Sequence, residues 1–104
     1  MIKSTSPAEL HQWLQSDQAV LIDVRQPEEY AAGHIKGATL QPLAQVSAKT
    51  LPPFQGKKLV MQCHLGGRSR TACGKLTQEI ANLDVYNLEG GIAAWANEGY
   101  EVEK

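Results

Sequence analysis

The order of the expected elements predicts an α/β fold with a mainly parallel sheet. Strand-like and helix-like segments alternate along the whole chain, as they do when helices connect parallel strands. Residues 19–22 and 59–61 are apolar on both faces, which suits strands buried inside such a sheet. The 104 residues are 42% hydrophobic and 20% charged, which is enough for one core, so we expect residues 1–104 to form a single domain.

The first half of the chain is expected to form two strands and two helices. Ser6-Pro7-Ala8-Glu9 is a capping box with proline at the first helical position. Leu10, Trp13 and Leu14 share one helical face, which predicts that they point inward. Gly33 suits the C-cap of the second, shorter helix. The expected elements are a strand at 2–4, a helix at 7–15, a strand at 19–22 and a helix from 26–30 to Gly33.

The second half is expected to continue the alternation. Pro42 suits the first turn of a short helix that runs through Val46 or Ala48. Two consecutive prolines, Pro52 and Pro53, mark a loop because they block both helix and central strand. The expected elements are an extended piece at 39–40, a loop at 51–56, a strand at 58–62, a helix at 69–81, a strand at 84–88 and a helix at 92–98.

Charge is segregated along the chain. The net charge is only −1, which argues against a nucleic-acid partner. All 11 acidic residues lie outside the span from Ala31 to Gln78. That span contains Lys36, Lys49, Lys57, Lys58, Arg68, Arg70 and Lys75. A positive field is therefore expected around any site within it, and such a field favours small anionic substrates.

One stretch within this basic span concentrates reactive chemistry. An apolar strand leads into it and a helix follows, so backbone N–H groups should converge there beside the positive end of the helix. A cysteine in this position has its thiolate stabilised and becomes nucleophilic at neutral pH. The stretch, called here the cysteine loop, is Cys63-His64-Leu65-Gly66-Gly67-Arg68-Ser69.

The chain resembles the rhodanese family of sulfurtransferases over nearly its whole length. The resemblance implies an α/β/α sandwich around a five-stranded, mainly parallel sheet, with the cysteine loop as the active site. It rests on several motifs in the family's order and spacing, which together are far more specific than any one of them. They are Asp23-Val24-Arg25, Glu29-Tyr30, Gly33-His34-Ile35-x-Gly37-Ala38, Cys63-x-x-Gly66-x-Arg68-Ser69, and Leu88-Glu89-Gly90-Gly91 with Trp95.

The family resemblance implies sulfur transfer, and the residues of the loop agree with it. Cys63 would take the outer sulfur of an anionic donor such as thiosulfate, and the resulting persulfide would pass it to cyanide or a cellular thiol, including a protein thiol. Gly66 and Gly67 permit the positive φ values that a ring of inward-facing amides needs. Arg68 would bind the oxyanion of the donor, and Ser69 would cap the helix and donate to the sulfur. With His64 and Leu65, these residues form the expected substrate site.

Two other functions compete with this prediction. A cysteine-dependent phosphatase or arsenate reductase uses a similar loop, but its spacing between cysteine and arginine is one residue longer. Here four residues, His64 to Gly67, separate Cys63 from Arg68, and the smaller ring suits a single sulfur atom better than a phosphoryl group. A non-catalytic binding module of the same fold is the second alternative, and the intact Cys63 and Arg68 count against it.

The remaining polar residues near the loop are interpreted as support. His34 is expected to tie a turn through its ring nitrogens. Asp23 and Arg25 are expected in a partly buried ion pair or hydrogen-bond hub, for example Arg25 with Glu29. His64 either tunes the pKa of the nucleophile or is a rim residue, and its sequence position favours neither.

The cysteines also predict a compartment. Cys63 and Cys73 give no disulfide framework and no zinc-ligand spacing, which fits a reducing compartment. Cys73 lies on the inward face of its helix, so we expect a buried hydrophobic residue and not a resolving thiol. No run is apolar enough to cross a bilayer and no signal peptide opens the chain, so we expect a cytoplasmic protein without cofactor or metal.

Overall fold

A computed structural model describes all residues from 1 to 104 and shows one five-stranded sheet. All neighbouring strands are parallel, in the order β1-β5-β4-β2-β3, which confirms the predicted fold class. The elements are β1 Ile2–Thr5, α1 Pro7–Gln15, β2 Ala19–Asp23, α2 Pro27–Ala32, β3 Thr39–Leu40, β4 Lys58–Gln62, α3 Gly67–Glu79, β5 Val85–Leu88 and α4 Gly91–Asn97.

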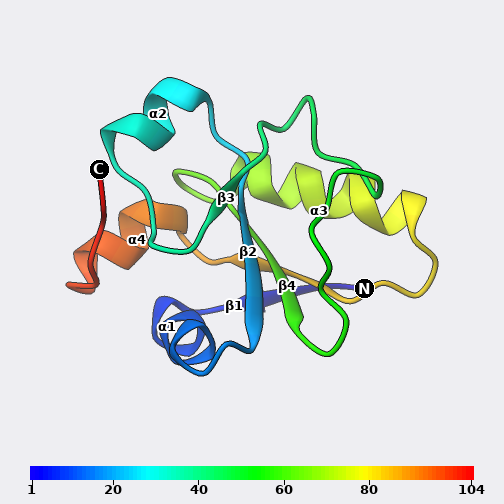
Figure 1. Cartoon of the computed structure of the whole chain (residues 1–104), viewed down its shortest axis with the longest axis horizontal. Coiled ribbons are helices and arrows are strands. Elements are labelled where there is room, and N and C mark those ends of the chain that lie inside the picture. Colours follow the sequence, from blue (N-terminus) through cyan, green and yellow to red (C-terminus); the bar gives the residue numbers. More distant parts are fainter.

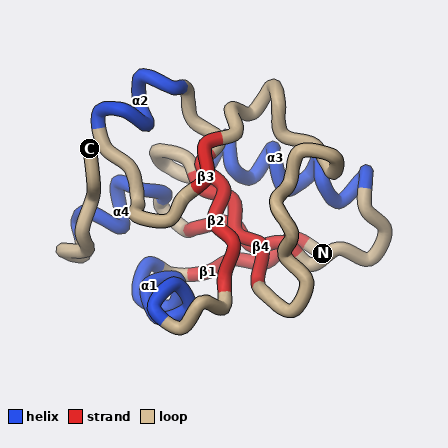
Figure 2. The backbone as a smooth tube through the Cα atoms, in the orientation of Figure 1, coloured by secondary structure: helices blue, strands red, loops and turns tan.

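Helices cover both faces of the sheet, so the molecule has three layers (Figure 1). Helix α3 packs on β4 and β5 through a cluster that includes Ala72, Cys73 and Leu76. The opposite face carries a second cluster with Leu10 of α1 and Trp95 of α4. Figure 2 shows the strands gathered at the centre with the helices around them. Burial of these two apolar clusters is the main force that holds the layers together.

The strand register brings three strand ends to one edge of the sheet. Asp23 at the end of β2 pairs with Gln62 at the end of β4, and Met61 of β4 pairs with Asn87 of β5. Cys63 follows Gln62 directly and therefore lies at the carboxyl edge of the sheet. This edge is where α/β proteins of this kind bind their ligands.

The helix after the cysteine loop begins earlier than predicted. It spans Gly67–Glu79 instead of 69–81, with Gly66 as its N-cap residue. Gly66 has φ of +110°, a turn that only glycine adopts easily, and this turn starts the helix directly. The expected cap by Ser69 is therefore wrong, because Ser69 lies within the first turn of α3.

The short helix expected from Pro42 is absent. Residues 43–45 form turns instead. The Leu43 N–H donates to the Val24 carbonyl at 3.0 Å, and Val46 is fully buried against the α3 side of the sheet. Because the Leu43 N–H is bound to Val24 and the Val46 side chain lies in the core, the segment follows the sheet and does not continue as a helix.

Two local expectations need smaller corrections. Trp13 is only half-buried, and its ring packs edge-on against Tyr86 with the Lys58 ammonium above it. Gly33 does end α2, but its φ of 165° is extended backbone and not the left-handed cap typical of glycine. The longest helix, α3, has 13 residues, and no helix combines the length and apolar character needed to cross a membrane.

Candidate functional site

The cysteine loop wraps around the sulfur of Cys63. The Gly66 N–H donates to Cys63 Sγ at 3.0 Å, and the Ser69 hydroxyl lies 3.3 Å from the same sulfur. The first turn of α3 starts at this loop, so the positive end of the helix faces the sulfur. The loop therefore has the inward-facing amides that the sequence predicts for an anion cradle. The positive φ expected for Gly66 is confirmed, but that expected for Gly67 is wrong because Gly67 is the first helical residue of α3.

The thiol of Cys63 is more buried than its loop position suggested, with only 1% of the residue exposed. Burial by itself raises the pKa of this thiol. Hydrogen bonds from the Ser69 hydroxyl and from the backbone amides of Ser69, Gly66 and Leu65 outweigh burial, so the net pKa lies below the ordinary value. The site is thus a covered sulfur whose thiol nevertheless has a pKa below the ordinary value.

Helix α4 holds the outer side of the loop. The N–H groups of Ile92 and Ala93 donate to the carbonyls of Cys63 and His64 at 2.9 and 3.1 Å. A Cβ on Gly91 would lie 2.4 Å from both carbonyl oxygens, and its φ of +60° is in the left-handed region. Only glycine fits this approach, which explains why the Glu89-Gly90-Gly91 turn accompanies the cysteine loop.

Arg68 does not point freely into the loop but forms a bidentate ion pair with Glu29 of α2. Its Nη1 and Nη2 donate to the two carboxylate oxygens at 2.7 and 2.9 Å. Hydrogen bonds from Arg68 and from the Gln26 N–H lower the pKa of Glu29 to about 2. The expected positive mouth is therefore partly neutralised, because an acid from outside the basic span folds onto Arg68. Glu29 was not predicted as a site residue.

The expected pair of Arg25 with Glu29 is wrong. Arg25 instead binds Asp23 through Nε and Nη2, with distances of 3.0 and 2.8 Å, and both side chains are buried. Its Nη2 also donates to the Gly33 carbonyl at 2.7 Å. The partner changes because Asp23 ends β2 next to Arg25, whereas Glu29 is engaged by Arg68. The pair ties β2 to the end of α2.

His34 lies outside the sulfur site. Its Nδ1 is 3.0 Å from the Tyr30 carbonyl, and its ring stacks on the Tyr30 ring at 3.9 Å. Its backbone forms a bridge with Glu103 near the C-terminus. These contacts agree with a supporting role. His64 and Leu65, by contrast, are exposed on the loop, and 68% of Leu65 is accessible.

Cys73 is buried like Cys63, but the pKa of its thiol is shifted in the opposite direction. It is fully buried in the cluster under α3, and burial raises the pKa of its thiol to about 12. Both cysteines are free thiols. No cluster of three or more His, Cys, Asp and Glu residues is arranged to hold a metal ion.

Two buried polar residues beside the loop escaped the sequence prediction. Asn87 of β5 donates through Nδ2 to the Gly66 carbonyl at 3.1 Å and accepts a hydrogen bond from Ser69 through Oδ1. Gln62 donates to the Cys63 carbonyl at 2.8 Å, and its Oε1 has no hydrogen-bond partner. Both residues interrupt otherwise apolar strands near their carboxyl ends. That irregularity is the signal in the sequence that marks them.

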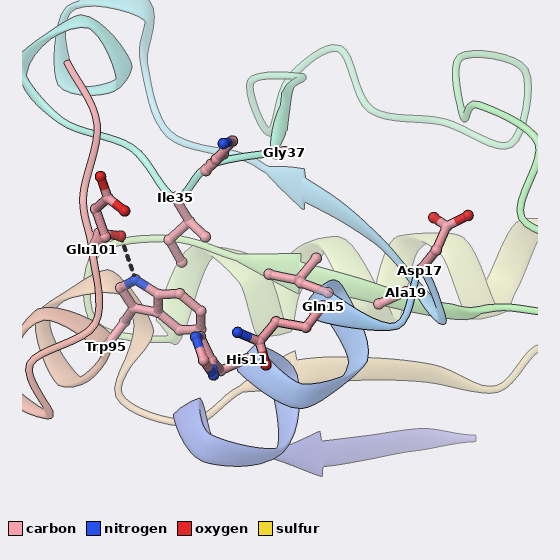
Figure 3. Close-up of a pocket in the computed structure, with 10 residues that line it drawn as sticks. His11, Gln15, Asp17, Ala19, Ile35, Gly37, Trp95 and Glu101 are labelled. Atoms are coloured by element: carbon pink, nitrogen blue, oxygen red, sulfur yellow. Dashed lines mark hydrogen bonds between the residues drawn. The ribbon is translucent and has the colours of Figure 1, made fainter.

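A well-defined cavity lies away from the cysteine loop. It measures about 530 Å³ between α1, α4 and the loop at Ile35–Gly37, and it does not include Cys63 (Figure 3). His11, Gln15, Trp95 and Glu101 line it, and the Trp95 indole donates to the Glu101 carbonyl. A shallower groove of about 270 Å³ adjoins the cysteine loop at His64. No predicted site residue lines the large cavity.

Similar proteins place the chain in a family. The profile of the rhodanese-like domain matches residues 6–98. A protein of Synechocystis, slr1261, is 35% identical over 95% of this chain, and a sulfurtransferase of Allochromatium vinosum is 33% identical over 84% of it. The crystal structure of a rhodanese-related protein from Thermoplasma volcanium is 32% identical, with a TM-score of 0.81 over 97% of both chains.

The relatives differ in length. The matched region spans 80% of the Allochromatium vinosum protein but 55% of slr1261 and 24% of two mycobacterial relatives. The extent of the profile match, the sequence identities and the fold all agree with the motifs around Cys63. The chain therefore belongs to the rhodanese-like domain family, whose members include sulfurtransferases.

Proposed function

We propose that this protein is a sulfurtransferase that moves a sulfane sulfur from an anionic donor such as thiosulfate to a thiophilic acceptor through a persulfide on Cys63. The observation that carries the proposal is the focus of hydrogen bonds on one sulfur. Gly66 N–H and the Ser69 hydroxyl converge on Cys63 Sγ, and they lower the pKa of its thiol against the opposing effect of burial. A thiolate in such a ring is nucleophilic at neutral pH.

The reaction takes place in two balanced half-reactions. The Cys63 thiolate attacks the outer sulfur of thiosulfate, the sulfur–sulfur bond of the donor breaks, and sulfite leaves with the bonding electron pair. The acceptor, cyanide or a thiolate, then attacks the terminal sulfur of the persulfide, and Cys63 leaves as a thiolate. The hydrogen-bond donors that stabilise the attacking Cys63 thiolate also stabilise the Cys63 thiolate that leaves in the second half-reaction, much as an oxyanion hole stabilises an oxygen anion.

Arg68 is proposed to bind the sulfonate end of the donor while it keeps its partner on α2. Glu29 uses one N–H on each terminal nitrogen of the guanidinium, so Nε–H and the other terminal N–H groups remain available. The ring between Cys63 and Arg68 contains four residues, which suits a single sulfur atom on Cys63 better than a phosphoryl group.

Substrates must displace the atoms that cover Cys63. His64, Leu65 and Gly67 are the exposed residues of the loop, whereas the carbonyls of Cys63 and His64 are held by the N–H groups of Ile92 and Ala93. No hydrogen bond holds the side chain of His64 or Leu65, so movement of these side chains would leave the backbone contacts of the loop intact. A protein thiol is one of the proposed acceptors. A reducing compartment such as the cytoplasm would keep Cys63 free for this reaction.

Mass analysis after incubation with thiosulfate tests the proposal. The parent and Cys73→Ser should each gain the mass of one sulfur atom, and Cys63→Ser should gain none. Added cyanide should then remove the extra mass and release thiocyanate. Turnover of an aryl phosphate or of arsenate, without sulfur uptake, would support the competing phosphatase or reductase. No reaction with several sulfane donors would favour a binding module.

A further inference from the structure

Asn87 hydrogen-bonds to two of the residues that donate to the Cys63 sulfur. It lies in β5, is 9% exposed, and makes no hydrogen bond of its own to the sulfur. Its Nδ2 donates to the carbonyl of Gly66, whose N–H binds Cys63 Sγ. Its Oδ1 accepts from the hydroxyl of Ser69, which also donates to the sulfur. A single amide therefore links two donors of the sulfur cradle.

The orientation of this amide follows from its neighbours. The Gly66 carbonyl has no hydrogen to give, so the Asn87 group facing it at 3.1 Å must be the NH₂. The oxygen of Asn87 therefore faces Ser69. A flipped amide would set two carbonyl oxygens against each other inside the fold, where an unpaired acceptor is costly.

The Ser69 hydroxyl has one hydrogen and two acceptors within reach. That hydrogen is donated either to Asn87 Oδ1 or to Cys63 Sγ, and not to both at full strength. With a protonated thiol, Cys63 donates to the Ser69 oxygen and Ser69 donates to Asn87. With a thiolate, the hydroxyl must rotate toward the sulfur and give up Asn87. Ionisation releases the thiol proton to solvent, and the rotation only redirects the hydroxyl hydrogen of Ser69 from Asn87 to the sulfur.

We propose that Asn87 is a positioning residue of the cysteine loop, which anchors Gly66 through Nδ2 and competes with the sulfur of Cys63 for the hydroxyl hydrogen of Ser69 through Oδ1. The competition keeps the sulfur more basic than Ser69 alone would make it. A more basic thiolate is the better nucleophile once it has formed, so the arrangement balances thiolate population against reactivity. The proposal rests on the proposed function only in taking Cys63 as the nucleophile.

No ionisable group near the sulfur competes for the Ser69 hydroxyl as Asn87 does. His64 is on the loop, Arg68 of α3 is paired with Glu29 of α2, and Arg25 is paired with Asp23 at the end of β2. Cys73 lies deeper under α3. No hydrogen bond links any of them to Asn87 or to the Ser69 hydroxyl. A change at Asn87 therefore reaches Cys63 through Ser69 and Gly66.

A double-mutant cycle separates the two parts of the proposal. Thiolate formation at Cys63 is followed by ultraviolet absorbance against pH in the parent, Asn87→Ala, Ser69→Ala and the double variant. Cys73 does not interfere, because its pKa of about 12 places its titration well above that of Cys63. In the Ser69→Ala background, Asn87→Ala should raise the pKa of Cys63, because the hydrogen bond from Asn87 to the Gly66 carbonyl is then the only one that is lost.

When Ser69 is present, Asn87→Ala also frees the Ser69 hydroxyl to donate to the Cys63 sulfur. Asn87→Ala should therefore shift the ratio of thiolate to thiol at Cys63 toward the thiolate by about 2- to 10-fold more when Ser69 is present than when it is absent. A factor of this size is expected for one neutral hydrogen bond. Asn87→Leu, which keeps the branched shape of the side chain and removes both hydrogen bonds, repeats the cycle if the alanine variant does not fold. Exposed Asn97→Ala is the matched control and should leave the titration unchanged.

Three results would overturn the proposal. Equal effects of Asn87→Ala in both backgrounds would show that Asn87 does not act through Ser69, and a coupling of opposite sign would show that it does not compete with the sulfur. An unchanged acidity in the Ser69→Ala background would overturn the anchoring of Gly66. None of these titrations requires sulfur transfer. A failure of the proposed function would instead appear as missing sulfur uptake in the mass experiment.

Discussion

The guanidinium of Arg68 holds both carboxylate oxygens of Glu29, a residue 39 positions earlier in the chain. This pair joins the first turn of α3 to α2 directly beside the sulfur of Cys63. It gives the site a cation whose charge is balanced and whose position is fixed. Side chains that bind anions well are commonly held in this way, because a fixed guanidinium loses less conformational entropy when the substrate arrives.

Arg68→Ala should weaken the use of anionic donors more than it weakens the fold. Loss of charge-assisted hydrogen bonds to the donor, with Glu29 left unpaired, should lower kcat/KM for thiosulfate by about 10- to 100-fold. Steady-state kinetics at several thiosulfate concentrations measure the change. Arg70→Ala, the neighbouring exposed cation, is the control and should stay near the parent. Parent-like kinetics in Arg68→Ala would show that Arg68 does not bind the donor.

Glu29→Gln should remove an acid-sensitive part of the stability. The pKa of Glu29 is lowered from 4.5 to about 2, so its contribution is complete above about pH 4.5 and is lost as the pH falls toward 2. Both side chains are about a third exposed, at 34% and 38%, which limits the pair to about 0.2–1 kcal/mol. Urea unfolding at several pH values should show a smaller acid loss in Glu29→Gln than in the parent. Glu28→Gln, which breaks no ion pair, should follow the parent, and an equal acid loss in Glu29→Gln would contradict the assignment.

Alkylation should distinguish the two cysteines. With its pKa near 12, Cys73 has a thiolate fraction of about one in 10⁵ at pH 7 and is also fully buried. Iodoacetamide should therefore modify Cys63 first and should reach Cys73 only in urea. Peptide mass analysis over time identifies the modified residue. Simultaneous labelling of both cysteines in the native protein would show that the sulfur environments do not differ as described.

Gly91→Ala should damage both the fold and the loop. The new Cβ would lie 2.4 Å from the Cys63 and His64 carbonyls at a residue with φ of +60°, so we expect a loss of at least about 2 kcal/mol. Gly74→Ala is the matched control. Gly74 lies inside α3 with no atom within 4 Å of a new Cβ, so alanine there should stabilise the protein by about 0.5–1 kcal/mol. Urea unfolding of both variants measures the contrast, and equal stabilities would contradict the close approach of α4 to the loop.

Much of the architecture could be predicted because local patterns specify it. The Ser6 cap and Pro7 place the start of α1 as predicted, although Glu9 accepts from the Thr5 hydroxyl and does not complete the capping box. Strand β4 spans Lys58–Gln62 as its apolar run predicts. The glycine at 66 and the strand before Cys63 require a tight turn at the carboxyl edge of a parallel sheet. Caps and tight turns are satisfied by groups a few residues away, and a run that is apolar on both faces suits only a buried strand, so each feature can be recognised within one segment of the chain.

The contacts of the site depended on the tertiary structure. By itself the sequence determined the order of elements, the parallel sheet and a cysteine loop facing a helix N-terminus. Only the folded chain decided that Arg68 pairs with Glu29, that Arg25 pairs with Asp23, and that Cys63 is covered. Asn87 reaches Ser69, 18 positions away, because the register of β4 and β5 places it under the loop. Such pairs are set by the packing of layers, and no pattern within one segment encodes which distant side chain will fill the space beside it.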